Sequence, residues 1–229
     1  MALVKDKKEI TNITRACQIT DEIFTSIISN FHFKTEIELA RFIKQEIKKR
    51  GLREAFPPIV TSGKQAGNSI HPKPTTATLS GFVIIDFGVR VQGYCSDMTR
   101  TIFVGTPSAS DKKIYSLVLG AKKAAEKKTK AGVSCAAADA AARKTLGAYK
   151  KYFIHMLGHG VGKRIHERPK MYFKLEDEVF LENMIVTIEP GVYIPNKLGI
   201  RIEDTYLVEA KGPRSLCTSP QKLFTFKAR

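Results

Sequence analysis

The sequence has no tryptophan and only four cysteines, Cys17, Cys95, Cys135 and Cys217. The cysteines are scattered and form no CxxC pair, which argues against a disulfide framework and a zinc finger and favours a reducing cytoplasm. No stretch reaches the roughly 18 consecutive apolar residues that a membrane helix needs. The chain is charged within a few residues of Met1 and has no signal-peptide core there. We therefore expect a cytoplasmic protein that does not enter the membrane.

Acidic residues are also scarce. The chain has 38 Lys and Arg against 22 Asp and Glu, a formal net charge of +16. Such a charge is typical of proteins that bind nucleic acid or an anionic surface. Much of the excess, however, is lysine spread between Lys112 and Lys151, without interleaved aromatic residues or a known nucleic-acid module. The pattern favours a solvated lysine-rich surface over a nucleic-acid partner, and the charge could also concentrate acidic peptides near the protein.

The 229 residues are 43% hydrophobic, and no linker or low-complexity segment divides them. Helical spacing of apolar residues and glycine breaks predict helices over 5–31, 35–50, 110–130 and 134–149. Thr35, with Glu38 three residues on, has the spacing of a capping box. Apolar runs predict strands over 82–87, 91–96, 99–104, 152–156, 184–188, 202–208 and 223–226. Because helices and strands come in groups, we expect one α+β domain over 1–229 with mostly antiparallel strands.

Two aspartates adjoin the predicted strands. Asp86 closes an apolar strand and Asp97 follows eleven residues later, beyond a glycine-containing segment. If that segment forms a hairpin, the two carboxylates converge, and burying two like charges requires a cation or a proton. Either aspartate alone could simply cap a turn. Asp86-Phe87-Gly88 also spells the magnesium motif of kinases, but no HRD sequence or Gly-rich loop precedes it.

Histidines and glutamates extend this set. Three of the five histidines, His155, His159 and His166, fall within twelve residues, and His159 lies between two glycines that allow close backbone approach. A single histidine is more often structural, but a cluster indicates a site. Glu189 and Glu203 each lie at or in an apolar strand segment, where an unpaired carboxylate is rare.

The candidate ligands are four carboxylates and one imidazole: Asp86, Asp97, His159, Glu189 and Glu203. Two divalent ions would be neutralised by four carboxylates, and an oxygen-rich set without sulfur suits Mn, Co or Fe(II) better than structural Zn. Two such ions can share a hydroxide that is a strong nucleophile near neutral pH. The composition predicts hydrolysis of an amide or ester.

The order and flanks of these residues resemble the pita-bread metallopeptidases, which include aminopeptidase P, prolidase and methionine aminopeptidase. The matching motifs are Asp86-Phe87-Gly88, Ser96-Asp97-Met98-Thr99-Arg100-Thr101, Gly158-His159-Gly160-Val161-Gly162, His166-Glu167-Arg168-Pro169, Ile188-Glu189-Pro190-Gly191 and Arg201-Ile202-Glu203-Asp204. The resemblance covers nearly the whole chain and is stronger to the Xaa-Pro branch than to the methionine branch. It implies an α+β pita-bread fold, a curved and mostly antiparallel sheet flanked by helices in two pseudo-symmetric halves.

The resemblance also implies roles for individual residues. Asp86 and Asp97 would hold one metal and His159 and Glu189 the other, with Asp97 and Glu203 bridging. Glu189 would also shuttle the proton of the bridging hydroxide. His71, His155 and His166 match histidines that line the substrate site, and His166 would stabilise the tetrahedral intermediate. Tyr193 and Arg201 match a pair beside the metals, where a cation orients the bridging carboxylates.

One departure from the family concerns the N-terminus. Members that cleave Xaa-Pro bonds usually carry an N-terminal domain that helps to form the dimer and narrows the substrate channel. Here the first helix of the catalytic domain begins almost at Met1. We therefore expect the catalytic domain alone, and we leave open monomer or dimer and dipeptide or longer peptide.

The resulting hypothesis is a dinuclear aminopeptidase that uses Mn or Co, with Fe or Zn as alternatives. It would cleave the first bond of an Xaa-Pro peptide with a free N-terminus by means of a metal-bridging hydroxide. A methionine aminopeptidase is the nearest alternative. A non-catalytic peptide- or nucleic-acid-binding protein on the same fold is the other, although such relatives typically lose metal ligands and none is lost here.

Overall fold

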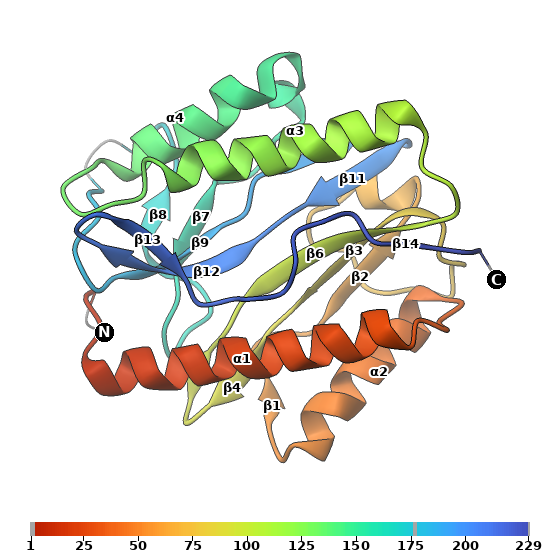
Figure 1. Ribbon diagram of the computed structural model, residues 1–229, viewed down its shortest axis with the longest axis horizontal. Coiled ribbons are helices and arrows are strands. Elements are labelled where there is room, and N and C mark those ends of the chain that lie inside the picture. The colour runs from red at the N-terminus through yellow and green to blue at the C-terminus, as the bar shows by residue number, and fades with distance from the viewer. Residues whose placement is uncertain (1–2, 176–177, 229) are drawn as a thin grey trace.

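The computed structural model describes residues 3–175 and 178–228 (Figure 1). It begins with two helices, α1 (Lys7–Ser29) and α2 (Glu36–Lys49). Asp6 and Thr35 are their N-caps, and each forms a capping box with the glutamate three residues on. The predicted helices over 5–31 and 35–50 and the capping box of Thr35 are therefore confirmed. Among the described residues no helix is long and apolar enough to span a bilayer.

The first half of the chain builds a four-stranded sheet in the order β14-β6-β3-β2. Its strands are β2 (Ile59–Ser62), β3 (Gly81–Phe87), β6 (Met98–Val104) and β14 (Thr225–Phe226). All pairs are antiparallel except β14 with β6, which brings the C-terminal segment back to the first half. The apolar faces of α1 and α2 pack on this sheet in one core cluster. The predicted strands over 82–87, 99–104 and 223–226 are present.

The prediction of one continuous strand over 91–96 is wrong, because a turn interrupts it. A tight turn at Gln92 and Gly93, with φ of 50° and 83°, splits it into a hairpin. The hairpin and one short partner form a small sheet of β1 (Arg53–Glu54), β4 (Val89–Val91) and β5 (Tyr94–Cys95). Glycine at the second turn position takes this left-handed φ without a steric cost, which explains why the chain reverses there.

The second half builds a five-stranded sheet in the order β13-β12-β9-β7-β8. Its strands are β7 (Gly158–Gly160), β8 (Glu167–Met171), β9 (Ile185–Ile188), β12 (Asp204–Glu209) and β13 (Gly212–Ser215). A separate hairpin consists of β10 (Gly191–Ile194) and β11 (Leu198–Arg201). The predicted strands over 184–188 and 202–208 are present within two residues, whereas β7, β8, β10, β11 and β13 were not predicted.

Two further helices, α3 (Ala109–Glu126) and α4 (Cys135–Leu146), cover the second half on the side opposite α1 (Figure 1). Both confirm predicted helices, although α4 ends three residues early. Gly147, with φ of 55°, stops it, and the 3-10 helix η2 (Gly147–Tyr152) follows. A second 3-10 turn, η1 (Gln65–Gly67), precedes β3. A core cluster under α3 and α4 contains residues of β9, β10 and β12.

The predicted strand over 152–156 is wrong. Tyr152 ends η2, and the next residues are irregular until β7 begins at Gly158. The carbonyls of Phe153 and His155, which a strand would offer to a neighbour, accept hydrogen bonds from the guanidinium of Arg143 instead. An apolar pattern alone does not reveal that a side chain from a helix replaces the ladder.

Candidate metal centre

The two aspartates lie at the first sheet, next to each other across one strand pair. Asp86 lies in β3 opposite Thr99 of β6, and Asp97 immediately precedes β6. Both side chains are buried and both line the same cavity. The hairpin between them therefore brings the two carboxylates together, as the sequence predicted.

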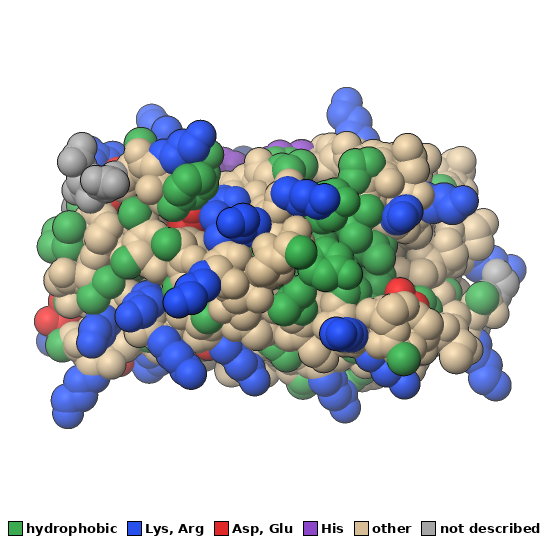
Figure 2. All heavy atoms as spheres, turned by 90° about the horizontal axis from the view of Figure 1, so that it is seen from above, with side chains coloured by type: hydrophobic (Ala, Val, Ile, Leu, Met, Phe, Trp, Pro, Cys, Tyr) green, Lys and Arg blue, Asp and Glu red, His purple; other side chains and the backbone are tan. Residues whose placement is uncertain are grey.

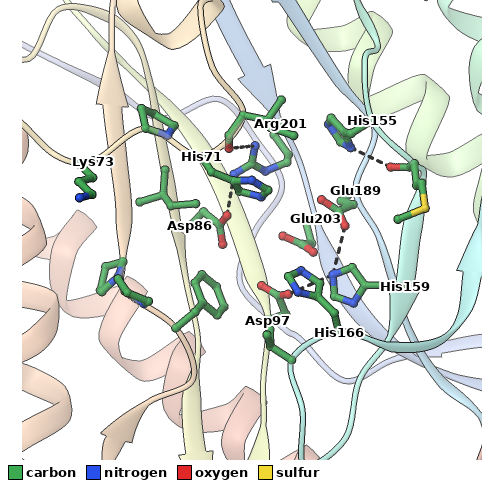
Figure 3. Close-up of a pocket in the computed structure, with 18 of the residues that line it drawn as sticks. His71, Lys73, Asp86, Asp97, His155, His159, His166, Glu189, Arg201 and Glu203 are labelled. Carbon is green, nitrogen blue, oxygen red and sulfur yellow. Dashed lines mark hydrogen bonds and ion pairs between the residues drawn. The ribbon is translucent and has the colours of Figure 1, made fainter.

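The second half contributes the remaining candidate ligands to this cavity (Figure 3). Ligand atoms of Asp97, His159 and Glu203 all lie within 4.8 Å of one another, close enough to share one ion. His159 Nε2 is also 3.4 Å from Glu189 Oε1 and 3.6 Å from Asp97 Oδ2. Residues more than one hundred positions apart thus converge at the junction of the two sheets.

Glycines position His159. A Cβ on Gly158 would lie 2.1 Å from the carbonyl oxygen of Thr187, and one on Gly160 would lie 2.0 Å from that of Arg168. Only glycine permits this packing of β7 between β8 and β9. The His159 Nδ1 lies 3.1 Å from the Gly160 carbonyl, which leaves Nε2 directed at the carboxylates.

The predicted pair beside the ligands, Tyr193 and Arg201, is also brought together. Arg201 Nη1 donates to the Tyr193 hydroxyl at 2.7 Å, and its Nη2 donates to Asp86 Oδ2 at 2.6 Å. One oxygen of Asp86, Oδ2, therefore faces the Arg201 guanidinium. The other, Oδ1, is buried and has no hydrogen-bond partner among the described residues.

Thr99 links Arg201 to Glu203 and was not predicted as a site residue. Its hydroxyl donates to Glu203 Oε2 at 2.6 Å and accepts from Arg201 Nε at 3.1 Å. Thr187 has a related place, because its hydroxyl lies 3.2 Å from Glu189 Oε1 and accepts from the His159 N–H at 3.1 Å. Thr99 lies in β6, two residues after Asp97, and Thr187 lies in β9, two residues before Glu189.

The electrostatics of the site fit divalent cations. Burial raises the pKa of Asp97 and of Glu203 well above the ordinary range, and neighbouring carboxylates raise both further. Burial raises the pKa of Glu189 to about 8 and outweighs the favourable charge of Arg201. Glu203 Oε1 is buried without a partner, like Asp86 Oδ1. Clustered carboxylates with free oxygens beside a neutral imidazole are a suitable donor set for oxygen-preferring divalent metals.

The three further histidines predicted for the substrate site all line the cavity: His71, His155 and His166. His155 Nε2 lies 2.9 Å from the Tyr193 hydroxyl, and burial lowers the pKa of His155 to about 3, so its ring is neutral. The ring of His166 lies 4.4 Å from that of His159, edge to face. His71 is exposed at the rim.

The cavity itself has a volume of about 470 Å³. An apolar wall faces the ligands and was not predicted; it consists of Phe56, Pro57, Pro58, Ile59, Ile70 and Pro72. The site is thus a polar, ligand-rich floor beside a surface suited to an apolar group.

Residues 11–210 match the model of metallopeptidase family M24, and the chain belongs to this family. It is 37% identical over 228 residues to a Pyrococcus horikoshii protein named Xaa-Pro dipeptidase, covering 97% of this chain and 65% of that protein. It is 42% identical over 219 residues to an uncharacterised peptidase of Methanocaldococcus jannaschii, and the match covers 93% of this chain and 62% of that protein.

Solved structures agree with this assignment. An X-Pro aminopeptidase from Thermotoga maritima matches with a TM-score of 0.92 and 34% identity, covering 97% of this chain and 64% of that one. A prolidase from Thermococcus sibiricus matches with a TM-score of 0.92 and 37% identity, covering 97% and 62%. The fold is therefore the pita-bread fold that the sequence resemblance implied. The chain spans less than two thirds of the length of these relatives.

Proposed function

We propose that the protein is a dinuclear metal-dependent aminopeptidase that hydrolyses the first peptide bond of Xaa-Pro peptides. The observation that carries this proposal is the buried cluster of Asp97, His159 and Glu203, with Glu189 and Asp86 in the same cavity. Burying so many carboxylates is costly unless cations compensate them.

Each ligand has a place in this proposal. Asp86 and Asp97 would hold one ion and His159 and Glu189 the other, and Asp97 and Glu203 would be shared between the two. Such ions, when bound, polarise a carbonyl and lower the pKa of water. Mn or Co suits the oxygen-rich donor set, with Fe or Zn as alternatives.

The protein's own groups supply the proton transfer and the binding of the oxyanion. The carboxylate of Glu189, which is ionised when a cation lies beside it, accepts the proton of the attacking water and passes it to the leaving amine. His166, beside His159 at the cavity floor, donates a hydrogen bond to the developing oxyanion. His71 and His155 also contact the peptide, His155 through its ring carbons, because Tyr193 and the Met156 carbonyl engage both of its ring nitrogens.

The substrate class is inferred from the cavity wall and from the relatives. The relatives named above are an Xaa-Pro dipeptidase, a prolidase and an X-Pro aminopeptidase. A proline ring is a compact apolar group that suits a wall of proline, phenylalanine and isoleucine side chains. The substrate is then a peptide with a free N-terminus. All four cysteines are free and buried, which supports a cytoplasmic setting.

A peptide panel tests the proposal. With added Mn or Co, the purified protein should cleave Ala-Pro and Ala-Pro-Xaa peptides and leave Met-Ala peptides intact. Asp97→Asn keeps the volume of the side chain but removes a charge from the cluster, and we expect it to reduce kcat by more than about 10³-fold. Preferred cleavage of Met-Ala would indicate a methionine aminopeptidase. Unchanged activity in Asp97→Asn would contradict the mechanism.

A further inference from the structure

His155 lies on a segment whose position no regular structure sets. Residues 153–156 fall between η2 and β7 and belong to no helix or strand. Nevertheless His155 lines the cavity and lies 2.9 Å from the Tyr193 hydroxyl. Some other contact must therefore hold this stretch of backbone against the cavity wall.

Arg143, near the end of α4, makes that contact. Its Nη1 donates to the Phe153 carbonyl at 2.7 Å, and its Nη2 donates to the His155 carbonyl at 2.7 Å. Its Nε donates at 2.9 Å to Oδ2 of Asp139, one turn earlier on the same helix. The side chain of Arg143 is 15% exposed and that of Asp139 is fully buried, so solvent competes little for these bonds.

A chain of ring contacts connects Arg143 to Tyr193. The guanidinium of Arg143 lies 4.2 Å from the centre of the Phe153 ring. The Phe153 ring meets the His155 ring edge-on at 4.9 Å, and the His155 ring meets that of Tyr193 at 5.4 Å. A planar cation suits both tasks, because it stacks on one ring and directs its N–H groups at two carbonyls.

We propose that Arg143 is a positioning residue for the peptidase site. It fixes the backbone and ring plane of His155, and through Tyr193 it supports Arg201 beside the metal ligands. This inference rests on the proposed function of His155 as a substrate-binding residue. Arg143 touches no substrate itself, since every nitrogen of its guanidinium is engaged with the protein.

A double-mutant cycle separates positioning from general stability. Arg143→Met and His155→Ala should each lower kcat/KM for Ala-Pro by about 10- to 100-fold. The kcat/KM of the double variant should be no lower than that of the poorer single variant, because both changes disrupt the same arrangement of side chains. If the losses of kcat/KM in the two single variants multiplied in the double variant, Arg143 would act independently of His155, and the proposal would be overturned. Lys144→Met, the exposed neighbour on α4, is the matched control and should leave kcat/KM unchanged.

Ring-nitrogen NMR gives a second readout that requires no turnover. In Arg143→Met the imidazole signals of His155 should shift, whereas those of the remote, exposed His32 should not. Unchanged His155 signals would also overturn the proposal. If Arg143→Met does not fold, Arg143→Lys keeps the positive charge but lacks the planar fork, and it serves in the same cycle. Absence of any peptide cleavage in the wild type would count against the proposed function alone, because the NMR comparison would still test Arg143.

Discussion

At the scale of single residues, Thr99 shows how the site depends on groups that bind no metal themselves. Its hydroxyl donates the one hydrogen bond that the Glu203 carboxylate accepts within the described residues, and it accepts a second hydrogen bond from Arg201. We expect Thr99→Val, which keeps the shape but removes the donor, to weaken metal binding by about 10- to 100-fold. Metal titration followed by activity measures this, with Thr99→Ser as the control that retains the hydroxyl. Equal metal affinity in all three proteins would exclude an orienting role for Thr99.

The same scale shows what the sequence could reveal about the site. The five candidate ligands could be singled out because each is a charged or imidazole group in an apolar or glycine-rich context. The apolar wall around Phe56 and Ile70 could not, because its residues come from two loops and the start of β2 and have no common spacing. The ion pair of Asp86 with Arg201 joins residues 115 positions apart, and only the fold specifies it.

At the scale of helices and strands, a buried ionic network joins α3 to β12. Lys122 is fully buried and lies 2.7 Å from Asp204, which Arg100 contacts from the other side. Burial opposes ionisation of Asp204, but the charges of Arg100 and Lys122 outweigh it and lower its pKa. Asp204 directly follows Glu203, and therefore this network holds a ligand-bearing backbone in place.

Lys122→Met should therefore destabilise the fold by about 3 kcal/mol, because it leaves part of a buried ionic network without its partner. Urea unfolding monitored by circular dichroism measures the change. The adjacent Lys123→Met, at an exposed position of the same helix, should change stability by less than about 0.5 kcal/mol. Similar values for the two variants would show that the network contributes nothing to stability.

The elements themselves were predictable where local signals agree. Apolar periodicity and glycine breaks located α1, α2, α3 and α4 to within a few residues, with a capping box at Thr35, because those signals lie within one segment. Short strands were harder. β10 and β11 have four residues each, and among the described residues they pair only with each other. The irregular run after Tyr152 was misjudged as a strand because Arg143, ten residues before Phe153, decides its conformation.

At the scale of the whole molecule, each half of the fold supplies part of the site. Asp86 lies in β3 and Asp97 just before β6, and the other three candidate ligands come from the second half. The excess positive charge is distributed: on the face seen from above, Lys and Arg side chains are scattered among apolar ones (Figure 2). This dispersion agrees with the solvated surface that the sequence favoured for that face.

The charge of the site links metal binding to pH. Without metal, the raised pKa values of Asp97, Glu189 and Glu203 mean that the folded protein retains protons which the unfolded chain loses. The metal-free fold should therefore lose stability as pH rises from about 4.5 towards 8. Metal binding in that range must displace these protons, and the displacement at Glu189 should diminish above pH 8, near its pKa of about 8.

Calorimetric titration of metal-free protein with Mn²⁺, repeated in buffers of different ionisation enthalpy, tests the central claim most directly because it counts ions and protons together. We predict two ions per chain, with net proton release at pH 6.5 that falls as pH rises above 8, and loss of at least one ion in Asp97→Asn. Failure to bind any ion, or binding without proton release and unaffected by Asp97→Asn, would contradict the two-metal site.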